Sequence, residues 1–328
     1  MYQGISINNC QIGLDISSGG PAGQTVGSVI MIDSSITNTP VGIVTSFTSS
    51  SSPTTAGSLI VENVVLSNVP TAIKANGATV LAGTSGSMTI QAWGEGHQYT
   101  PNGPSRFQGP ITPVSRPGSL LGGGGKYYTR SKPQYSDLHV SSFISVRAGG
   151  AQGNGFTDDT ASLQATINIA TLLGKVVYFD CGMYKITSTL FIPPGAKIVG
   201  EGYATLLHSG PYFNDMNNPK VVVRVGNPGD TGRVEWSDMV VSGQGTQAGA
   251  ILIEWNLASP SSNPSGMWDV HTRVGGIVGS NLQLAQCGKR PSVVGQVRTE
   301  CIGAYMLMHV TASAQGLYLE NVWLWTAE

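Results

Sequence analysis

The sequence predicts an all-β fold of stacked coils, a β-solenoid. Three observations support this prediction: a repeat of about 30 residues, apolar residues at alternate positions before each repeat's turn, and a low content of charged residues. Only 11% of the 328 residues are charged, while 44 are glycine and 18 are proline. Globular proteins usually carry about 25% charged residues. Polarity that comes instead from serine, threonine, asparagine and glycine favours short strands joined by tight turns.

The repeat is clearest in the first 75 residues. Asn9, Asn38 and Asn68 lie 29 and 30 residues apart, and each follows alternating apolar residues and precedes a turn and a further short strand. Alternation with a period of two indicates a strand with one buried face. Asparagine at the same turn of each coil suits a left-handed corner or a ladder of stacked amides. A single coil cannot bury its own apolar face, so stacking of coils is expected to stabilise the fold.

The same coil type returns at the end of the chain, because Leu59–Leu66 and Leu317–Leu324 agree at five of eight positions. Between these segments, residues 101–138 are rich in glycine, proline and serine, as linkers often are. We therefore expect coils of a first solenoid over residues 1–120, a linker over 121–138, and a second solenoid over 139–328.

A helix is predicted at the start of the second solenoid, where it would cover the open apolar end of the first coil. Thr157 or Asp159 can cap its N-terminus and Gly174 can end it. Its apolar face would consist of Leu163, Ile167 and Ala170. The pair Asp158–Asp159 is interpreted as helix capping, with catalysis or Ca²⁺ binding as the alternative.

Charge and cysteine content restrict the classes of partner. The formal net charge of −1, without a cluster of lysine and arginine, argues against nucleic acid and fits a neutral polysaccharide. No apolar stretch reaches the length of a membrane span. The spacing of the four cysteines matches no zinc pattern, so neither metal nor cofactor is expected. Cys287 and Cys301 could close a polar loop as a disulfide or stay free, and Cys10 and Cys181 are expected to be buried thiols.

The run from Phe143 to Gly202 resembles the opening of right-handed β-helices of the pectate-lyase-like superfamily. It contains GAQGNGFTDDT, a helical stretch, VVYFDCGMY and IPPGAKIVGE. Longer pieces resemble more specifically the fungal exo-β-1,3-glucanases of glycoside hydrolase family 55. They are GHQYTPNGPSRFQGPITPVSRP (96–117), GKYYTRSKPQY (125–135), VEWSDMVVS (234–242), AILIEWNLA (250–258), GMWDVHTRVGG (266–276) and LYLENVWLWTAE (317–328).

The resemblance implies two tandem right-handed parallel β-helices with an active-site groove between them. It implies a secreted, monomeric hydrolase that inverts the anomeric centre and releases glucose from the non-reducing end of β-1,3-glucan. The family's general acid and water-positioning residues match no position of this sequence. The catalytic residues are therefore expected outside an internal fragment, which alone would be inactive.

Candidate substrate-binding residues are Trp325 and Glu328, which the resemblance places in a sugar-binding subsite through the family's W-T-A-D pattern. Glu328 replaces the aspartate of that pattern. Trp268, His271 and Arg273 are weaker candidates. Trp236 and Trp255, each preceded by a glutamate, also suggest sugar stacking. For these two and for Trp268, the alternative is packing against a coil or under a loop. For His271 and Arg273, which with Asp269 alternate along one strand, the alternative is a salt-linked surface ladder. The carboxylates at coil positions, Asp15, Asp33, Glu62 and Glu320, are expected to be solvated strand or turn residues.

Two other functions remain open. A pectin-active enzyme with the same fold would need basic clusters or clustered aspartates for its anionic substrate, and its motifs are not found in order. A non-catalytic β-helix that binds or supports another molecule is compatible with the repeats alone.

Overall fold

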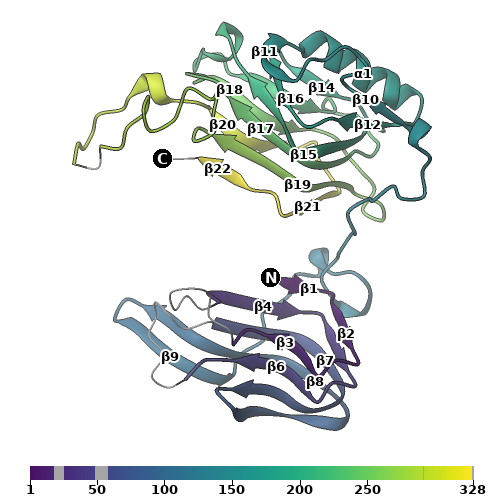
Figure 1. Cartoon of the computed structure of the whole chain (residues 1–328), viewed down its shortest axis with the longest axis vertical. Helices are drawn as coiled ribbons and strands as arrows, with labels where there is room; N and C mark the ends of the chain where they lie inside the picture. Colours follow the sequence, from purple (N-terminus) through teal and green to yellow (C-terminus); the bar gives the residue numbers. More distant parts are fainter. Residues whose placement is uncertain (18–25, 49–57, 291, 327–328) are drawn as a thin grey trace. The chain divides into compact units, whose positions relative to one another are not determined.

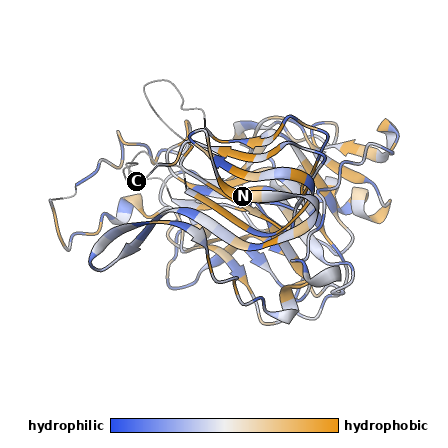
Figure 2. Ribbon diagram, turned by 90° about the horizontal axis from the view of Figure 1, so that it is seen from below, coloured by the Kyte–Doolittle hydropathy of each residue, from blue (hydrophilic) through white to orange (hydrophobic). Residues whose placement is uncertain are grey.

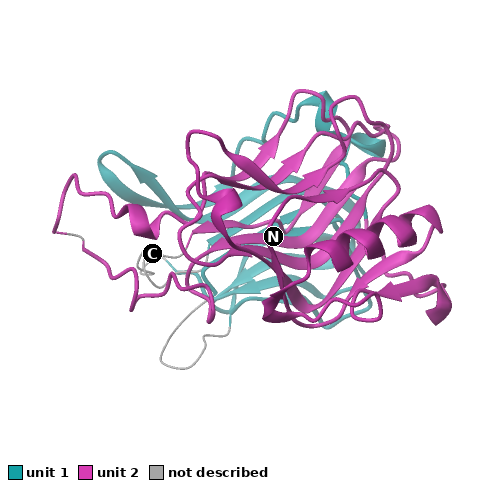
Figure 3. Ribbon diagram, turned by 90° about the horizontal axis from the view of Figure 1, so that it is seen from above, with its two compact units in different colours: residues 1–130 teal, residues 131–328 magenta. Residues whose placement is uncertain are grey.

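The computed structural model describes residues 1–17, 26–48, 58–290 and 292–326, which form two compact units, Met1–Arg130 and Ser131–Glu328 (Figures 1 and 3). The division falls inside the segment 121–138 that the sequence marks as a linker. Each unit is built largely of parallel strands, which confirms an all-β, parallel β-helical fold. The right hand of the coils stays an expectation from the resemblance.

In unit 1, strands of successive coils pair in parallel, so that equivalent apolar residues stack. Ile7 pairs with Ile36, and Ile36 pairs with Leu66; the last two are buried. The strands of these coils are β1 (Tyr2–Gln3), β2 (Ser6–Asn8), β3 (Ile12–Asp15), β4 (Ser28–Ile32), β5 (Ser35–Thr37), β6 (Val41–Thr45) and β7 (Ser58–Ala75).

The rest of unit 1 departs from the predicted parallel coils. β8 (Ala78–Thr100) and β9 (Gly103–Pro110) run antiparallel, β8 beside β7 and β9 beside β8. The reversal occurs at Asn76 and Gly77, both with positive φ (44° and 86°). An Asn-Gly pair of this kind makes the two-residue turn of a β-hairpin. β8 thereby folds back along the edge of β7, which would otherwise expose unpaired backbone groups.

The corner asparagines of unit 1 behave as predicted. Asn9, Asn38 and Asn68 have φ values of 57°, 49° and 53°, which are left-handed corners. The side-chain amide of Asn68 donates to Oδ1 of Asn38 at 3.1 Å. Asparagine tolerates this conformation better than most residues, which explains its recurrence at intervals of one coil.

A second corner of unit 1 contains a buried ion cluster, although Asp33 and Glu62 were expected to be solvated. Their exposed fractions are 2% and 5%. The guanidinium of Arg116 binds both carboxylates, at 2.6 Å and 2.7 Å, and the backbone N–H of Tyr127 donates to Asp33. The expectation failed because the charge partner lies more than 50 residues away in the sequence.

Unit 2 consists of stacked parallel coils covered by one helix (Figure 1). One sheet contains β10 (Phe143–Ser145), β11 (Asn154–Asp158), β12 (Val176–Phe179), β13 (Met183–Ile186), β15 (Lys197–His208), β17 (Glu235–Gly243), β19 (Ser265–Val274), β21 (Leu317–Glu320) and β22 (Leu324–Thr326). A second contains β14 (Leu190–Ile192), β16 (Lys220–Val225), β18 (Ala250–Trp255) and β20 (Met306–Val310). Short 3-10 turns occur in unit 2 at Val140–Ser142, Pro211–Phe213 and Thr299–Cys301, and in unit 1 at Gly118–Leu120 and Gly123–Gly125.

The predicted helix is α1 (Thr160–Leu172), and its buried face includes Leu163, Ile167 and Ala170. Asp158 accepts a hydrogen bond from the backbone N–H of Thr160, at 3.1 Å. The carboxylate of Asp159, 1% exposed, instead accepts from the backbone N–H groups of Gln152 and Gly153. Asp159 holds the N-cap position of α1, but its side chain makes no capping hydrogen bond, so the predicted capping by Thr157 or Asp159 is wrong. The carboxylate is used instead to hold the preceding loop, while Asp158 binds the first residue of the helix.

The core of unit 2 lies between its sheets and contains large aromatic side chains. Trp236, Trp255 and Trp268 are exposed by 1% or less. Hydrophobic residues recur along the strands with hydrophilic ones between them (Figure 2). These three tryptophans therefore have the packing role that was the alternative to sugar binding.

The four cysteines form one disulfide and two exposed thiols, and the exposure of the thiols differs from the prediction. Cys287 and Cys301 form a disulfide that closes a loop between β19 and β20. Cys10 and Cys181, predicted to be buried, are both exposed. Each lies in the turn between two strands and not within a strand, where alternation would bury it. No helix among the described residues has the length and apolarity needed to cross a membrane.

Candidate functional site

An open pocket lies on the outer surface of unit 2, over the strands β15, β17, β19 and β22. Its volume is about 460 Å³. Its lining combines aromatic, aliphatic and polar side chains: Tyr203, Thr205, Val240, His271, Arg273, Ile277, Asn321, Trp323 and Trp325.

Parallel register brings these residues together from coils far apart in the sequence. Val240 on β17 lies between Thr205 on β15 and His271 on β19. Two residues further along β19, Arg273 pairs with Trp325 on β22. Because side chains alternate between the faces of a strand, residues at every second position share the outer face.

Aromatic rings form a continuous row along the pocket. The rings of Tyr203 and His271 have centroids 5.4 Å apart, and those of His271 and Trp323 are 5.6 Å apart. Trp323 and Trp325 follow at 6.3 Å, with their planes at 62°. The two indoles are 53% and 44% exposed, unlike the buried tryptophans of the core. Exposed aromatic faces of this kind suit the CH surface of an uncharged ring.

One face of Trp325 is occupied by a cation. The guanidinium carbon of Arg273 lies 4.3 Å from the centroid of the indole, which is a cation–π contact. A terminal nitrogen of Arg273 also donates to the carbonyl of Gly276, at 3.2 Å. The arginine thus fixes the indole from one side.

His271 is uncharged near neutral pH. Burial lowers the pKa of His271, although the charges of Asp269 and Asp238 act in the opposite direction. Its Nδ1 accepts a hydrogen bond from the backbone N–H of Trp323, at 3.3 Å, which requires that nitrogen to be unprotonated. The neutral imidazole therefore helps to hold β22 against β19.

The edge of the pocket is polar and charged. Lys132 binds the carboxylates of Asp238 and Asp269, and the side-chain amide of Asn321 also donates to Asp269. Burial would raise the pKa of Asp269, but the hydrogen bonds from Asn321 and Lys132 and the charge of Lys132 lower it below its usual value. The Asp269 carboxylate is therefore stabilised in its ionised form.

The structure brings together three of the five predicted site residues. His271, Arg273 and Trp325 line the pocket. Trp268 lies in the core, and Glu328 lies outside the described residues. Asp269 does not line the pocket with His271 and Arg273, because it turns at a corner with φ of 54° and binds Lys132. Of the three residues, Asp269 is thus the one with the salt-linked role that was the alternative to sugar binding.

Sequence reasoning missed Trp323, Tyr203 and Asn321. Trp323 had a usable signal, since it stands two positions before Trp325 and should share its face. Tyr203 had none, because its approach to His271 depends on the register of two coils. Asn321 was visible as the equivalent of Asn63, but its place beside a pocket was not.

The described lining favours binding over acid–base chemistry. It includes no carboxylate, whereas glycoside hydrolysis uses a pair of carboxyl groups. No cluster of three metal-ligating side chains occurs among the described residues. The arrangement supplies aromatic faces, a guanidinium, an imidazole and an amide, which are the usual contacts of a sugar ring.

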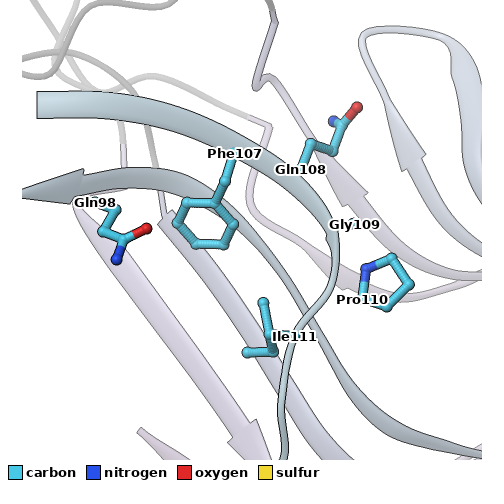
Figure 4. Close-up of a pocket in the computed structure, with 6 residues that line it drawn as sticks. All are labelled: Gln98, Phe107, Gln108, Gly109, Pro110 and Ile111. Carbon is cyan, nitrogen blue, oxygen red and sulfur yellow. The ribbon is translucent and has the colours of Figure 1, made fainter.

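Unit 1 contains a second pocket of about 430 Å³ at β8 and β9 (Figure 4). It is lined by Gln98, Phe107, Gln108, Gly109, Pro110 and Ile111. The ring of Phe107 lies against Gly94, where any Cβ would come within 3.0 Å of it. With one aromatic ring and no titratable side chain in its lining, this pocket offers less chemistry than that of unit 2.

Comparisons with known proteins agree with the fold and the resemblance. Residues 143–254 match the family model described as "Rhamnogalacturonase A/epimerase, pectate lyase-like". The whole chain is 49% identical to a "Glucan 1,3-beta-glucosidase" of Cochliobolus carbonum. It is 33% identical to a "Probable glucan endo-1,3-beta-glucosidase" of Arthroderma benhamiae, again over 100% of the chain. Over 98% of its length it is 37% identical to the "Non-secreted LysM effector LysM19" of Penicillium expansum.

The chain covers 41%, 48% and 26% of these three relatives, respectively. It therefore spans less than half the length of each. The predicted resemblance to fungal β-1,3-glucanases is confirmed along the whole chain, and the pectate-lyase-like character is confirmed over residues 143–254.

Proposed function

We propose that this chain is part of a glycoside hydrolase that cleaves β-1,3-glucan, and that the pocket of unit 2 binds the sugar chain. The observation that carries the proposal is the exposed pair Trp323 and Trp325 in the open pocket of unit 2, in a chain 49% identical to a glucan 1,3-β-glucosidase. A neutral glucan suits such a surface because sugar CH groups can cover indole faces without desolvating an ion.

The finer features follow the family resemblance. We propose exo action from the non-reducing end, inversion at the anomeric carbon, release of glucose, and a secreted, monomeric protein. The disulfide Cys287–Cys301 supports secretion, because disulfides persist mainly in oxidising compartments. Glu328 remains a proposed hydrogen-bonding partner of the sugar beside Trp325.

The chemical step is assigned to residues outside this chain, because no pocket-lining carboxylate is described. We expect the 328-residue chain to release no appreciable glucose from laminarin, and the full-length protein to release it readily. A positioned general acid alone contributes about 10²–10⁴-fold to a rate. Robust release by the chain alone would contradict this assignment and point to a carboxylate within it.

The experiment measures glucose release from laminarin by both proteins, with the anomer first formed identified by NMR. Inversion predicts α-glucose as the first product from a β-linked substrate. A β-anomer would exclude inversion, and internal cleavage to oligosaccharides would exclude exo action.

The second candidate is a non-catalytic glucan-binding module. It is favoured by the same pocket lining, which contains aromatic rings and no carboxylate, and by the similarity to a LysM effector protein. If the full-length protein binds laminarin but releases no sugar from it, the binding module replaces the glycoside hydrolase as the proposed function.

A further inference from the structure

Trp323 is held by two hydrogen bonds even though its side chain is 53% exposed. Its indole N–H donates to Oδ1 of Asn321 at 2.6 Å, and its backbone N–H donates to Nδ1 of His271 at 3.3 Å. An exposed tryptophan without such bonds would rotate about two side-chain torsions. Here the polar edge of the ring is fixed toward the corner of the coil, so the apolar face has one orientation in the pocket.

The orientation of the Asn321 amide is itself fixed by charge. Its NH₂ group donates to Oδ1 of Asp269, and Oδ2 of Asp269 accepts from Lys132 at 3.0 Å. An ionised carboxylate only accepts hydrogen bonds, so the NH₂ group must face it and the carbonyl oxygen must face the indole. A flipped amide would lose both bonds. Lys132 also binds Asp238, which ties the corners of successive coils together.

Unit 1 contains the same corner without the aromatic ring. Asn63 has φ of 52°, Asn321 has φ of 51°, and Asn63 donates to Asp33 at 2.6 Å. Arg116 binds Asp33 as Lys132 binds Asp269. In the aligned repeats, however, Val65 occupies the position of Trp323. The stacked corner is therefore a structural device of the coil, and in unit 2 it is additionally connected to a pocket residue.

We infer that Asn321 is a positioning residue for the pocket: backed by Asp269 and Lys132, it sets the angle of Trp323 beside Trp325 and so shapes the surface on which the sugar lies. This inference rests on the proposed function for the identity of the ligand. The hydrogen-bonded chain Lys132–Asp269–Asn321–Trp323 lies wholly within unit 2 and consists of contacts that do not need a ligand.

The test compares Asn321→Gly with the matched control Asn63→Gly in the full-length protein. Glycine tolerates the left-handed corner in both places, so each variant removes one amide without backbone strain. Binding of laminaritriose is measured by calorimetry. The environment of Trp323 is followed separately, without sugar, by ¹⁹F NMR of protein labelled with 5-fluorotryptophan, with the Trp323 signal assigned through Trp323→Phe.

We expect Asn321→Gly to shift or broaden the Trp323 signal and to weaken laminaritriose binding about 10-fold, because a mobile indole has to be ordered when the sugar binds. Asn63→Gly should change neither. Asp269→Asn, which keeps the shape and the left-handed corner, should move the same signal by a smaller amount. If Asn321→Gly does not fold, the Trp323 signal of Asp269→Asn tests the inference in its place, and an unchanged signal in that variant would overturn it.

An unchanged Trp323 signal in Asn321→Gly would overturn the inference, as would equal weakening of binding in both glycine variants. If the unmodified protein does not bind laminaritriose, the proposed function fails. The ¹⁹F signal then still decides whether Asn321 fixes Trp323, so the two failures remain distinguishable.

Discussion

Arg273 lies over the indole of Trp325, with its guanidinium carbon 4.3 Å from the ring centroid. The two residues are direct partners in the parallel register of β19 and β22. A contact between adjacent coils thus joins a charged residue to an exposed aromatic ring, and a ligand that stacks on this indole has to use the face opposite Arg273.

Replacing Arg273 with methionine should test this contact. Methionine retains much of the apolar stem and removes the charge. The binding free energy of the sugar should therefore fall by about 0.5–1 kcal/mol, the usual value for an exposed cation–π pair. We expect laminaritriose binding to weaken about 2- to 5-fold. Calorimetry measures the effect, and Arg273→Lys should recover part of it. Unchanged binding in the methionine variant would remove Arg273 from the sugar-binding role.

Trp325→Ala should reduce function much more than stability. Because the side chain is 44% exposed, its removal leaves little cavity, while the proposed sugar platform is lost. In the full-length protein, we expect kcat/KM for laminarin to fall at least about tenfold, which corresponds to about 1.4 kcal/mol, with only a small change in Tm.

Trp268→Ala is the matched control for that measurement. Its indole is 1% exposed, so the variant should lose about 3–5 kcal/mol of stability while folded molecules keep their turnover. The assignment of Trp325 is wrong if Trp325→Ala melts far lower and retains normal turnover per folded molecule.

His208 should make the protein sensitive to acid. Burial lowers the pKa of His208 to about 4, from an ordinary 6.5, although backbone carbonyl groups of Ser242 and Gly303 act against the shift. As the pH falls below 6.5, the unfolded chain takes up a proton that the folded protein excludes. Stability should therefore fall between about pH 6.5 and 4, by about 3 kcal/mol from this group.

His208→Leu removes that proton uptake. Denaturant unfolding at several pH values should show a shallower loss of stability toward pH 4 in the variant than in the unmodified protein. Equal slopes would mean that the buried imidazole does not contribute to acid sensitivity.

Arg116→Met should destabilise unit 1 strongly. It would leave Asp33 and Glu62, 2% and 5% exposed, without their cation. Removing one partner of a buried ion pair costs about 3–5 kcal/mol. Thermal unfolding measures the loss, and Arg116→Lys should restore part of it. A loss below 1 kcal/mol would indicate that water reaches these carboxylates.

The disulfide Cys287–Cys301 should also stabilise the protein. It joins cysteines 14 residues apart, and closing a loop of that size contributes about 3 kcal/mol. The double variant Cys287→Ser with Cys301→Ser should melt at a lower temperature than the oxidised protein. Reduction of the unmodified protein should lower Tm similarly, and no effect of either change would contradict a stabilising role.

The sequence by itself determined the coil. The 30-residue spacing, the alternation of apolar residues and the asparagines at left-handed corners are local properties, because each follows from the conformations that a few neighbouring residues can adopt. The same holds for α1 and its face of Leu163, Ile167 and Ala170. The resemblance to glucanases was likewise visible in contiguous segments.

Tertiary structure decided which side chains meet. Register between coils brought Tyr203 to His271 and Arg273 to Trp325 across separations of 68 and 52 residues, and it buried Trp268 while exposing Trp323. It also supplied Arg116 to Asp33, which the sequence left as an ordinary turn residue. Burial and charge pairing depend on which coils stack and on how loops return over them. The period and the alternation of apolar residues specify which face of a strand a side chain lies on. They do not specify which strand lies next to it, and the pocket is formed by side chains from neighbouring strands.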